Sequence, residues 1–242
     1  MPSSANLLAT MLLVTCTSCH APKELEDVSA PPSPTELADA CRLLHDAAAG
    51  QWSARIEPVV RAGAAAEAPL IELIDARPSA AGAQASIATL GRIGGPAAVE
   101  LCRRLVEERS ALAVEAALAL GELPGEALDK VLIACVQDSF TDATLRTAAA
   151  CALVRHGEQD HGPRWIAAVV RAGTPAGRMD ERELGVPSKT RWARERYFVQ
   201  RTLQKLGHTD LMERLDTDAS WPTLERLAPE VEARLRGSTA KK

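Results

Sequence analysis

A basic and aromatic segment is the part of the sequence best suited to bind a ligand. Residues 171–205 contain nine Lys and Arg residues against four Asp and Glu residues, and four of the chain's seven aromatic residues lie in or beside this segment. Guanidinium groups pair with carboxylates and phosphates, and Trp and Arg are common anchors of protein interfaces. The alternative is a solvated surface loop whose aromatic residues pack on neighbouring helices. The candidate binding patch consists of Arg178, Arg182, Arg191, Trp192, Arg194, Arg196 and Tyr197.

The thiol of Cys16 is a second candidate for chemistry. The preceding apolar run, residues 7–14, is too short for the roughly 20 residues that span a bilayer and has the length of a signal-peptide core. Residues 21–35 are polar and contain four prolines, which predicts an extended tether. Leu13-Val14-Thr15-Cys16 resembles the lipobox of bacterial lipoproteins. The resemblance implies that Cys16 is acylated and anchors the chain to the membrane, with Cys19 as a second candidate acceptor.

The same cysteines also form part of a haem-attachment string. Cys16-Thr17-Ser18-Cys19-His20 matches C-x-x-C-H, in which two thiols bond the haem vinyl groups and the imidazole binds iron. The string lies between the apolar run and the Pro-rich tether, so no neighbouring element provides a haem pocket. Acylation of Cys16 would also consume one thiol. We therefore expect no cofactor.

Two further groups of side chains offer weaker chemistry. His156, Glu158, Asp160 and His161 lie within one turn and have metal-ligand side chains, but no matching pair follows them, so we expect no metal site. Four cysteines lie on apolar helical faces, where a thiol behaves as a small hydrophobic group: Cys41, Cys102, Cys135 and Cys151. Export would permit a disulfide between Cys135 and Cys151.

The sequence contains no local signature of an enzyme. G-x-S-x-G, a phosphate-binding Gly-rich loop and H-E-x-x-H are all missing from the 242 residues. We therefore expect no catalytic residues. The net charge of −4 argues against a general nucleic-acid binder, which normally carries a basic excess.

The composition predicts that helices position these groups. Of the residues, 46% are hydrophobic, 44 are Ala, and only 3% are aromatic. Sheets need more Val, Ile, Thr and aromatic residues to fill a pleated surface. Small side chains suit closely packed helices, so the predicted fold class is all-α.

The chain also repeats itself at a nearly constant interval. Residues 88–94 (Ala-Thr-Leu-Gly-Arg-Ile-Gly) recur 30 residues later as 118–124 and, after a further 33, as 151–157. Residues 59–63 and 202–207 hold the same place upstream and downstream. Such periodic helix ends, each stopped by Gly or Pro, are typical of stacked two-helix units.

Each repeat is expected to contain two amphipathic helices. In one unit Pro96 begins a helix with a buried stripe at helical spacing, and its partner helix ends near 124–125. In the next unit Thr141 or Asp142 caps the second helix. We also expect Ala88, Ala98, Ala117 and Ala148 on buried faces. The predicted core positions are Ala98, Leu101, Cys102, Leu105, Val106, Val114, Ala117, Leu118, Leu120, Leu128, Val131, Leu132, Cys135, Leu145, Ala148, Ala149, Ala152 and Leu153.

Residues 88–99 and 145–157 resemble HEAT repeats, in particular the short bacterial PBS-lyase HEAT-like type. The resemblance implies a right-handed, armadillo-like α-solenoid over residues 36–242, interrupted by an insertion at about 171–191. It leaves function open, because such folds host scaffolds, adaptors, bilin lyases and DNA glycosylases. A non-repetitive Ala-rich bundle is the alternative fold.

Together these features predict a signal peptide at 1–15, a flexible linker at 16–35 and a HEAT-like domain at 36–242. We expect a non-enzymatic scaffold at the cell envelope, anchored on the periplasmic side or the exterior, that binds another protein and no nucleic acid. The alternatives are an enzyme on the same scaffold, bilin lyase-like or DNA glycosylase-like, and a cytosolic adaptor.

Overall fold

The computed structural model describes residues 32–123, 127–172, 188–216 and 221–238. The chain divides into two units, Met1–Pro32 and Ser33–Lys242, and the following concerns the second. Its described residues form twelve α-helices and no strand, which confirms the all-α prediction. The expected signal peptide, Cys16 and most of the linker and the 171–191 insertion lie outside the described residues.

The first four helices are α1 (Pro34–His45), α2 (Trp52–Arg61), α3 (Glu67–Ala76) and α4 (Ala83–Ile93), with 3-10 turns at Ala49–Gln51 and Gly63–Ala66. A capping box begins α1: the Ser33 hydroxyl accepts a hydrogen bond from the Glu36 N–H, and the Glu36 carboxylate accepts one from the Ser33 N–H. These bonds satisfy amides that the first helical turn leaves free, so the start of the helix is well defined.

The next four helices match the two predicted repeats. They are α5 (Pro96–Glu107), α6 (Ala113–Leu120), α7 (Ala127–Gln137) and α8 (Ala143–His156). Pro96 occupies the first turn of α5, and the predicted stripe on α5 is buried along its whole length. The cap of α8 is Asp142, whose carboxylate accepts hydrogen bonds from the Thr144 and Leu145 N–H groups. Local sequence signals therefore located these helices correctly.

Three predicted core positions on α6 and α7 are only half-buried, and one alanine predicted to be buried is exposed. Val114, Leu118 and Val131 pack on the core but keep partial exposure. Ala98, Ala117 and Ala148 are buried as expected, whereas Ala88 is exposed. The prediction for Ala88 was wrong because this face of α4 borders a cavity, described below, instead of a neighbouring helix.

The last helices are α9 (His161–Ala172), α11 (Ser188–Lys205), α12 (Thr209–Asp216) and α13 (Trp221–Ser238). α13 packs mainly on α9, and α12 contacts both α11 and α13. Among the described helices, none is both long and apolar enough to cross a membrane.

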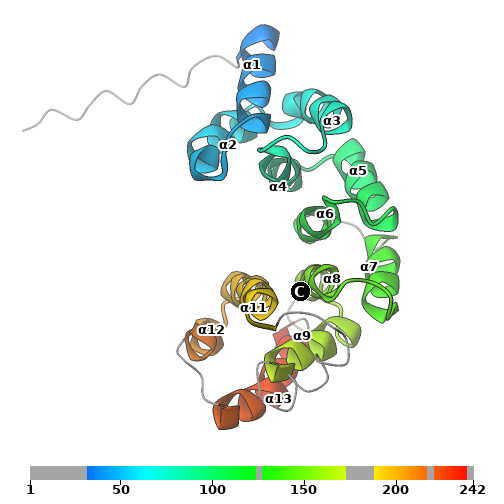
Figure 1. Ribbon diagram of the computed structural model, residues 1–242, viewed down its shortest axis with the longest axis vertical. Helices are drawn as coiled ribbons and strands as arrows, with labels where there is room; N and C mark the ends of the chain where they lie inside the picture. Colours follow the sequence, from blue (N-terminus) through cyan, green and yellow to red (C-terminus); the bar gives the residue numbers. More distant parts are fainter. Residues whose placement is uncertain (1–31, 124–126, 173–187, 217–220, 239–242) are drawn as a thin grey trace, which may run out of the picture. The chain divides into compact units, whose positions relative to one another are not determined.

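The helices of Ser33–Lys242 contact one another in a regular order. Consecutive helices pair as α1·α2, α3·α4, α5·α6, α7·α8 and α9·α11. The first members of these pairs contact in turn as an outer row, α1, α3, α5, α7 and α9; the second members form an inner row, α2, α4, α6, α8 and α11 (Figure 1). Each row thus brings together helices that lie one sequence repeat apart.

Small residues allow the inner row to pack closely. A Cβ atom added to Gly91 would lie 3.0 Å from the Ala119 Cα, and one added to Gly121 would lie 2.8 Å from the Ala152 Cα. Glycine of one repeat therefore meets alanine of the next at equivalent positions. This contact explains why the chain is rich in small residues and poor in aromatic ones.

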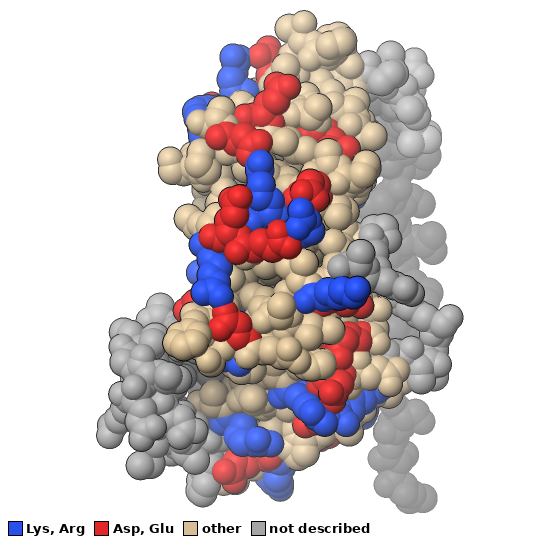
Figure 2. Space-filling model, turned by 90° about the vertical axis from the view of Figure 1, so that its right-hand side faces the viewer, with Lys and Arg blue, Asp and Glu red and all other residues tan. Residues whose placement is uncertain are grey.

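The outer row is covered by paired charges. Arg103 lies between Glu100 and Glu107 on α5, with N–O distances of 2.6 Å to each carboxylate. Arg104 of α5 reaches Asp75 of α3 at 2.5 Å. Acidic and basic side chains interleave over this face (Figure 2). Such a face carries little net charge.

Candidate functional site

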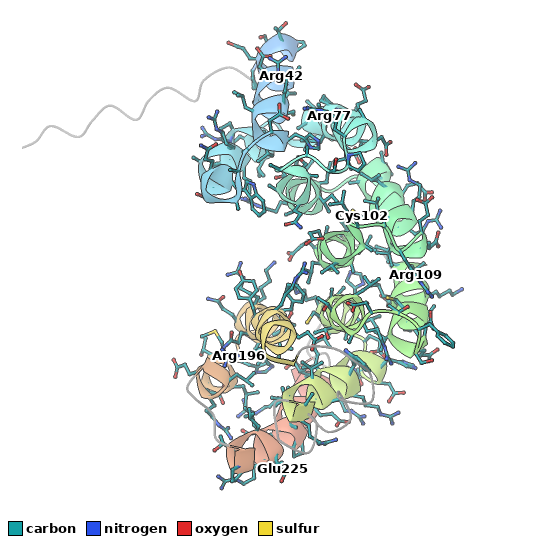
Figure 3. The ribbon with its side chains drawn as sticks, viewed as in Figure 1. Arg42, Arg77, Cys102, Arg109, Arg196 and Glu225 are labelled. Atoms are coloured by element: carbon teal, nitrogen blue, oxygen red, sulfur yellow. The ribbon has the colours of Figure 1, made fainter. Side chains whose placement is uncertain are left out.

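A cavity of about 310 Å³ lies between α4, α6 and α8 on one side and α11 on the other. Side chains of α6 and α11 extend toward one another there (Figure 3). The lining residues come from helices far apart in the sequence: Ala88, Arg92, Glu115, Leu118, Ala119, Glu122, Arg155, Tyr197, Phe198, Arg201 and Lys205.

Helix α6 and the turn that follows it, which contains Glu122, supply the floor of the cavity. Glu115, Leu118, Ala119 and Glu122 recur at the i, i+3, i+4 and i+7 spacing of one helical face. The opposite face of α6 is buried in the core, so this stripe is fixed toward the cavity. It presents two carboxylates at its ends and apolar atoms between them.

Helix α11 supplies the facing wall. Phe198 is buried, whereas Tyr197 remains 56% exposed, which is unusual for a large aromatic residue. Arg201 and Lys205 follow at one-turn intervals and are exposed. This wall therefore combines the accessible Tyr197 ring with the cations Arg201 and Lys205.

Arg155 of α8 is the most enclosed charged residue of the cavity. Its side chain is only 10% exposed. Its Nη1 donates to the Glu122 carboxylate at 2.8 Å and its Nη2 to the Thr202 hydroxyl at 3.2 Å. Its Nε is buried and has no hydrogen-bond partner among the residues that the structure describes. A buried N–H group without a hydrogen-bond acceptor costs free energy. The packing of the helices therefore leaves one buried donor of this site unsatisfied.

The two carboxylates of the cavity are already engaged. Glu122 also pairs with Lys205. Glu115 accepts a hydrogen bond from Arg194 at 3.0 Å, and the Arg194 guanidinium lies 5.7 Å from the centre of the Phe198 ring. Burial raises the pKa of the Glu115 carboxyl, against the opposing effects of its own backbone N–H and of Arg194.

The cations of the cavity outnumber its carboxylates. Four Arg and Lys residues line it, against Glu115 and Glu122. Arg92 forms a long pair with Glu57, 3.5 Å apart and with both side chains about half exposed, which contributes little. Arg201 donates to the neutral side chain of Gln204. Arg92 and Arg201 are thus available to an anion.

The structure divides the predicted patch. Arg194 and Tyr197 lie at the cavity, whereas Arg196 is directed to α12, with its Nη1 3.4 Å from the Leu215 carbonyl oxygen. Figure 3 labels Arg196 on this side of α11. Arg191 and Trp192 belong to α11, but their side chains lie outside the described residues. Arg178 and Arg182 lie wholly outside them.

Sequence reasoning missed the half of the site that comes from earlier helices. Arg92, Glu122 and Arg155 hold the same place in three copies of the repeat, two residues before its Gly or Pro stop or, in 151–157, its final Gly. Lys205, within the 171–205 segment, holds this place in a fourth copy. Charged side chains at one repeat position mark the ends of successive inner-row helices. An alignment of the repeats would have shown that this position carries a charged residue in each copy.

The other candidate groups have structural partners. His156 contacts the Asp129 carboxylate at 2.8 Å and the Leu120 carbonyl at 2.9 Å. His161 contacts Glu158. In the part of the chain that the structure describes, no three His, Cys, Asp or Glu side chains are placed to hold a metal ion.

The described cysteines are buried, unpaired thiols. Burial raises the pKa of Cys41 and of Cys135 to about 11 and that of Cys102 to about 12. Burial also raises the pKa of Cys151. Since the thiolate is the reactive form, these side chains act as core residues.

A second cavity, about 410 Å³, lies at the outer row between α5 and α7. Its charges balance: Arg109 and Lys130 stand against Glu107 and Asp138, and Arg109 pairs with Asp138. It lacks both the excess of cations and an aromatic wall. The inner cavity is therefore the better candidate for binding.

No protein-family model, curated protein or solved structure matches this chain.

Proposed function

We propose that this protein is a non-enzymatic adaptor, a HEAT-like α-solenoid that binds another protein through its inner row of helices. The regular order of helix contacts supports the solenoid, because equivalent helices of successive repeats meet along two rows. The repeated Gly–Ala contacts between α4, α6 and α8 support a common repeat unit. The N-terminal lipobox-like sequence supports a lipid anchor at the cell envelope.

The observation that carries the binding function is the inner cavity with Tyr197 at its edge. An exposed aromatic ring beside available arginines is the side-chain combination enriched at the centres of protein interfaces. The described lining residues include no Ser, Cys or His, so the cavity offers arginine, lysine, tyrosine and paired carboxylates. This set suits recognition better than nucleophilic catalysis.

Site-directed photo-crosslinking in the native cells tests the function. A benzoylphenylalanine at Tyr197 should form a covalent adduct with one protein partner. The same group at Phe140, which is 90% exposed but does not line the cavity, is the matched control and should not form that adduct. Equal adducts at both positions, or none at Tyr197, would contradict binding through the inner row.

A further inference from the structure

The inner cavity differs in charge from the rest of the protein. Its lining carries four cations and two carboxylates, whereas the whole chain has a net charge of −4. Glu115 and Glu122 are engaged by Arg194, Arg155 and Lys205. An incoming carboxylate would therefore meet Arg92 and Arg201 before any unpaired acid.

The cavity also offers an apolar contact between these cations. Leu118 is half-buried on the floor, Ala88 is exposed beside it, and the Tyr197 ring stands at the edge. A volume of about 310 Å³ is at the lower end of ligand pockets. It fits one or two side chains of a larger partner.

We propose that the cavity binds an acidic segment of the partner protein, with an apolar side chain between Leu118 and Tyr197 and carboxylates on Arg92 and Arg201. This inference rests on the proposed adaptor function. On the described part of the outer row, Arg103, Arg104 and Arg109 are already paired with acids from their own or a neighbouring repeat. Arg155 fixes the wall by holding Glu122 and Thr202.

A nucleic acid fits the site less well than a peptide. A cavity of about 310 Å³ has room for one or two side chains, not for a run of nucleotides. Nucleic-acid binding also needs a basic stripe that follows several phosphates, whereas the cations here surround one small cavity. A single-stranded oligonucleotide therefore serves as the competing probe.

Fluorescence anisotropy with defined probes on the full chain tests the proposal. The probes are a short labelled peptide in which glutamate alternates with leucine, its glutamine counterpart, and oligothymidine. We expect the glutamate peptide to bind at least tenfold more tightly than either other probe, because only this peptide carries carboxylates that can pair with Arg92 and Arg201. Raising the salt concentration should weaken this binding.

Matched variants locate the binding. Arg92→Glu with Arg201→Glu should weaken binding of the glutamate peptide at least tenfold. Lys130→Glu with Arg226→Glu makes the same change in net charge at exposed residues outside the cavity and should leave affinity within about twofold. Tyr197→Ser should weaken binding about fivefold without changing the helical circular dichroism, because the ring is exposed.

Three results would each overturn the inference: no binding of the glutamate peptide, equal binding of the glutamine peptide or of oligothymidine, or equal losses in the cavity and control variants. The crosslinking experiment separates this failure from failure of the adaptor function. If position 197 crosslinks to a partner segment that lacks acidic residues, the adaptor function stands and the proposed preference for an acidic segment is wrong. If Tyr197 forms no adduct, the adaptor function itself fails.

Discussion

Arg155 shows how one side chain joins helices that are distant in sequence. From α8 it bonds Glu122, which follows α6, and Thr202 of α11. With its side chain 10% exposed, the guanidinium is largely removed from water. Its bonds therefore define the distance between the two walls of the cavity.

Replacing this arginine should destabilise the protein. Arg155→Met should lower the free energy of unfolding by about 1 to 3 kcal/mol, because the buried Thr202 hydroxyl loses a donor and Glu122 keeps only Lys205 as a cationic partner. Urea denaturation followed by circular dichroism measures the change. Arg201→Met, at an exposed neighbour, is the control and should stay within about 0.5 kcal/mol. Equal effects of the two variants would show that Arg155 does not hold the walls together.

At the scale of the helices, close contact between small residues determines how the inner row packs. Gly121 follows α6 and faces Ala152 of α8, while Gly91 of α4 faces Ala119 of α6. In the sequence these glycines are part of the recurring segments 88–94 and 118–124, ahead of the residues that stop the helices. The structure adds that they allow one backbone to approach the next, since any side chain would occupy that space.

A methyl group at this contact should be costly. In Gly121→Ala the new Cβ would lie 2.8 Å from the Ala152 Cα, a backbone atom that can move only with its helix. We expect a loss of about 1 to 3 kcal/mol in the free energy of unfolding, as for other overpacked sites.

Gly237→Ala is the matched control in the last turns of α13. A Cβ there meets nothing within 4 Å, so the better helix propensity of alanine should leave the stability unchanged or raise it by up to about 1 kcal/mol. Thermal and urea unfolding of both variants check the prediction. A neutral Gly121→Ala variant would mean that α6 and α8 can separate freely.

At the scale of the whole molecule, the repeat unit and the N-terminal segment make separate contributions. The repeat yields rows of helices and the cavity, whereas the lipobox-like segment yields the expected anchor at Cys16. Residues 1–31 lie outside the described part, so the anchor stays a prediction from the sequence.

Membrane fractionation combined with mass spectrometry tests the anchor. The mature protein should begin at an acylated Cys16 and sediment with membranes. Cys16→Ser should move the protein to the soluble fraction, and Cys19→Ser should leave it on the membrane. A wild-type protein that is soluble and still begins at Met1 would contradict the lipoprotein assignment.

Local sequence signals were enough to predict the helices of the central repeats. The stripe from Ala98 to Val106, the first-turn Pro96 and the cap Asp142 are local signals, because helix formation depends on neighbours three or four residues away. The sequence also indicated Arg194 and Tyr197 as binding residues. It did not predict that Ala88 is exposed, because the exposure of this residue depends on which helix lies opposite it.

Which charged residues form the site depends on the tertiary structure. In the folded chain Arg92, Glu122 and Arg155 line the same cavity as Tyr197, whereas Arg196 contacts α12. Residues on one helix are related by its period, but the pairing of α11 with α8 depends on packing across a long sequence separation. No local pattern encodes that contact, so the cavity and the direction of its arginines became known only from the folded chain.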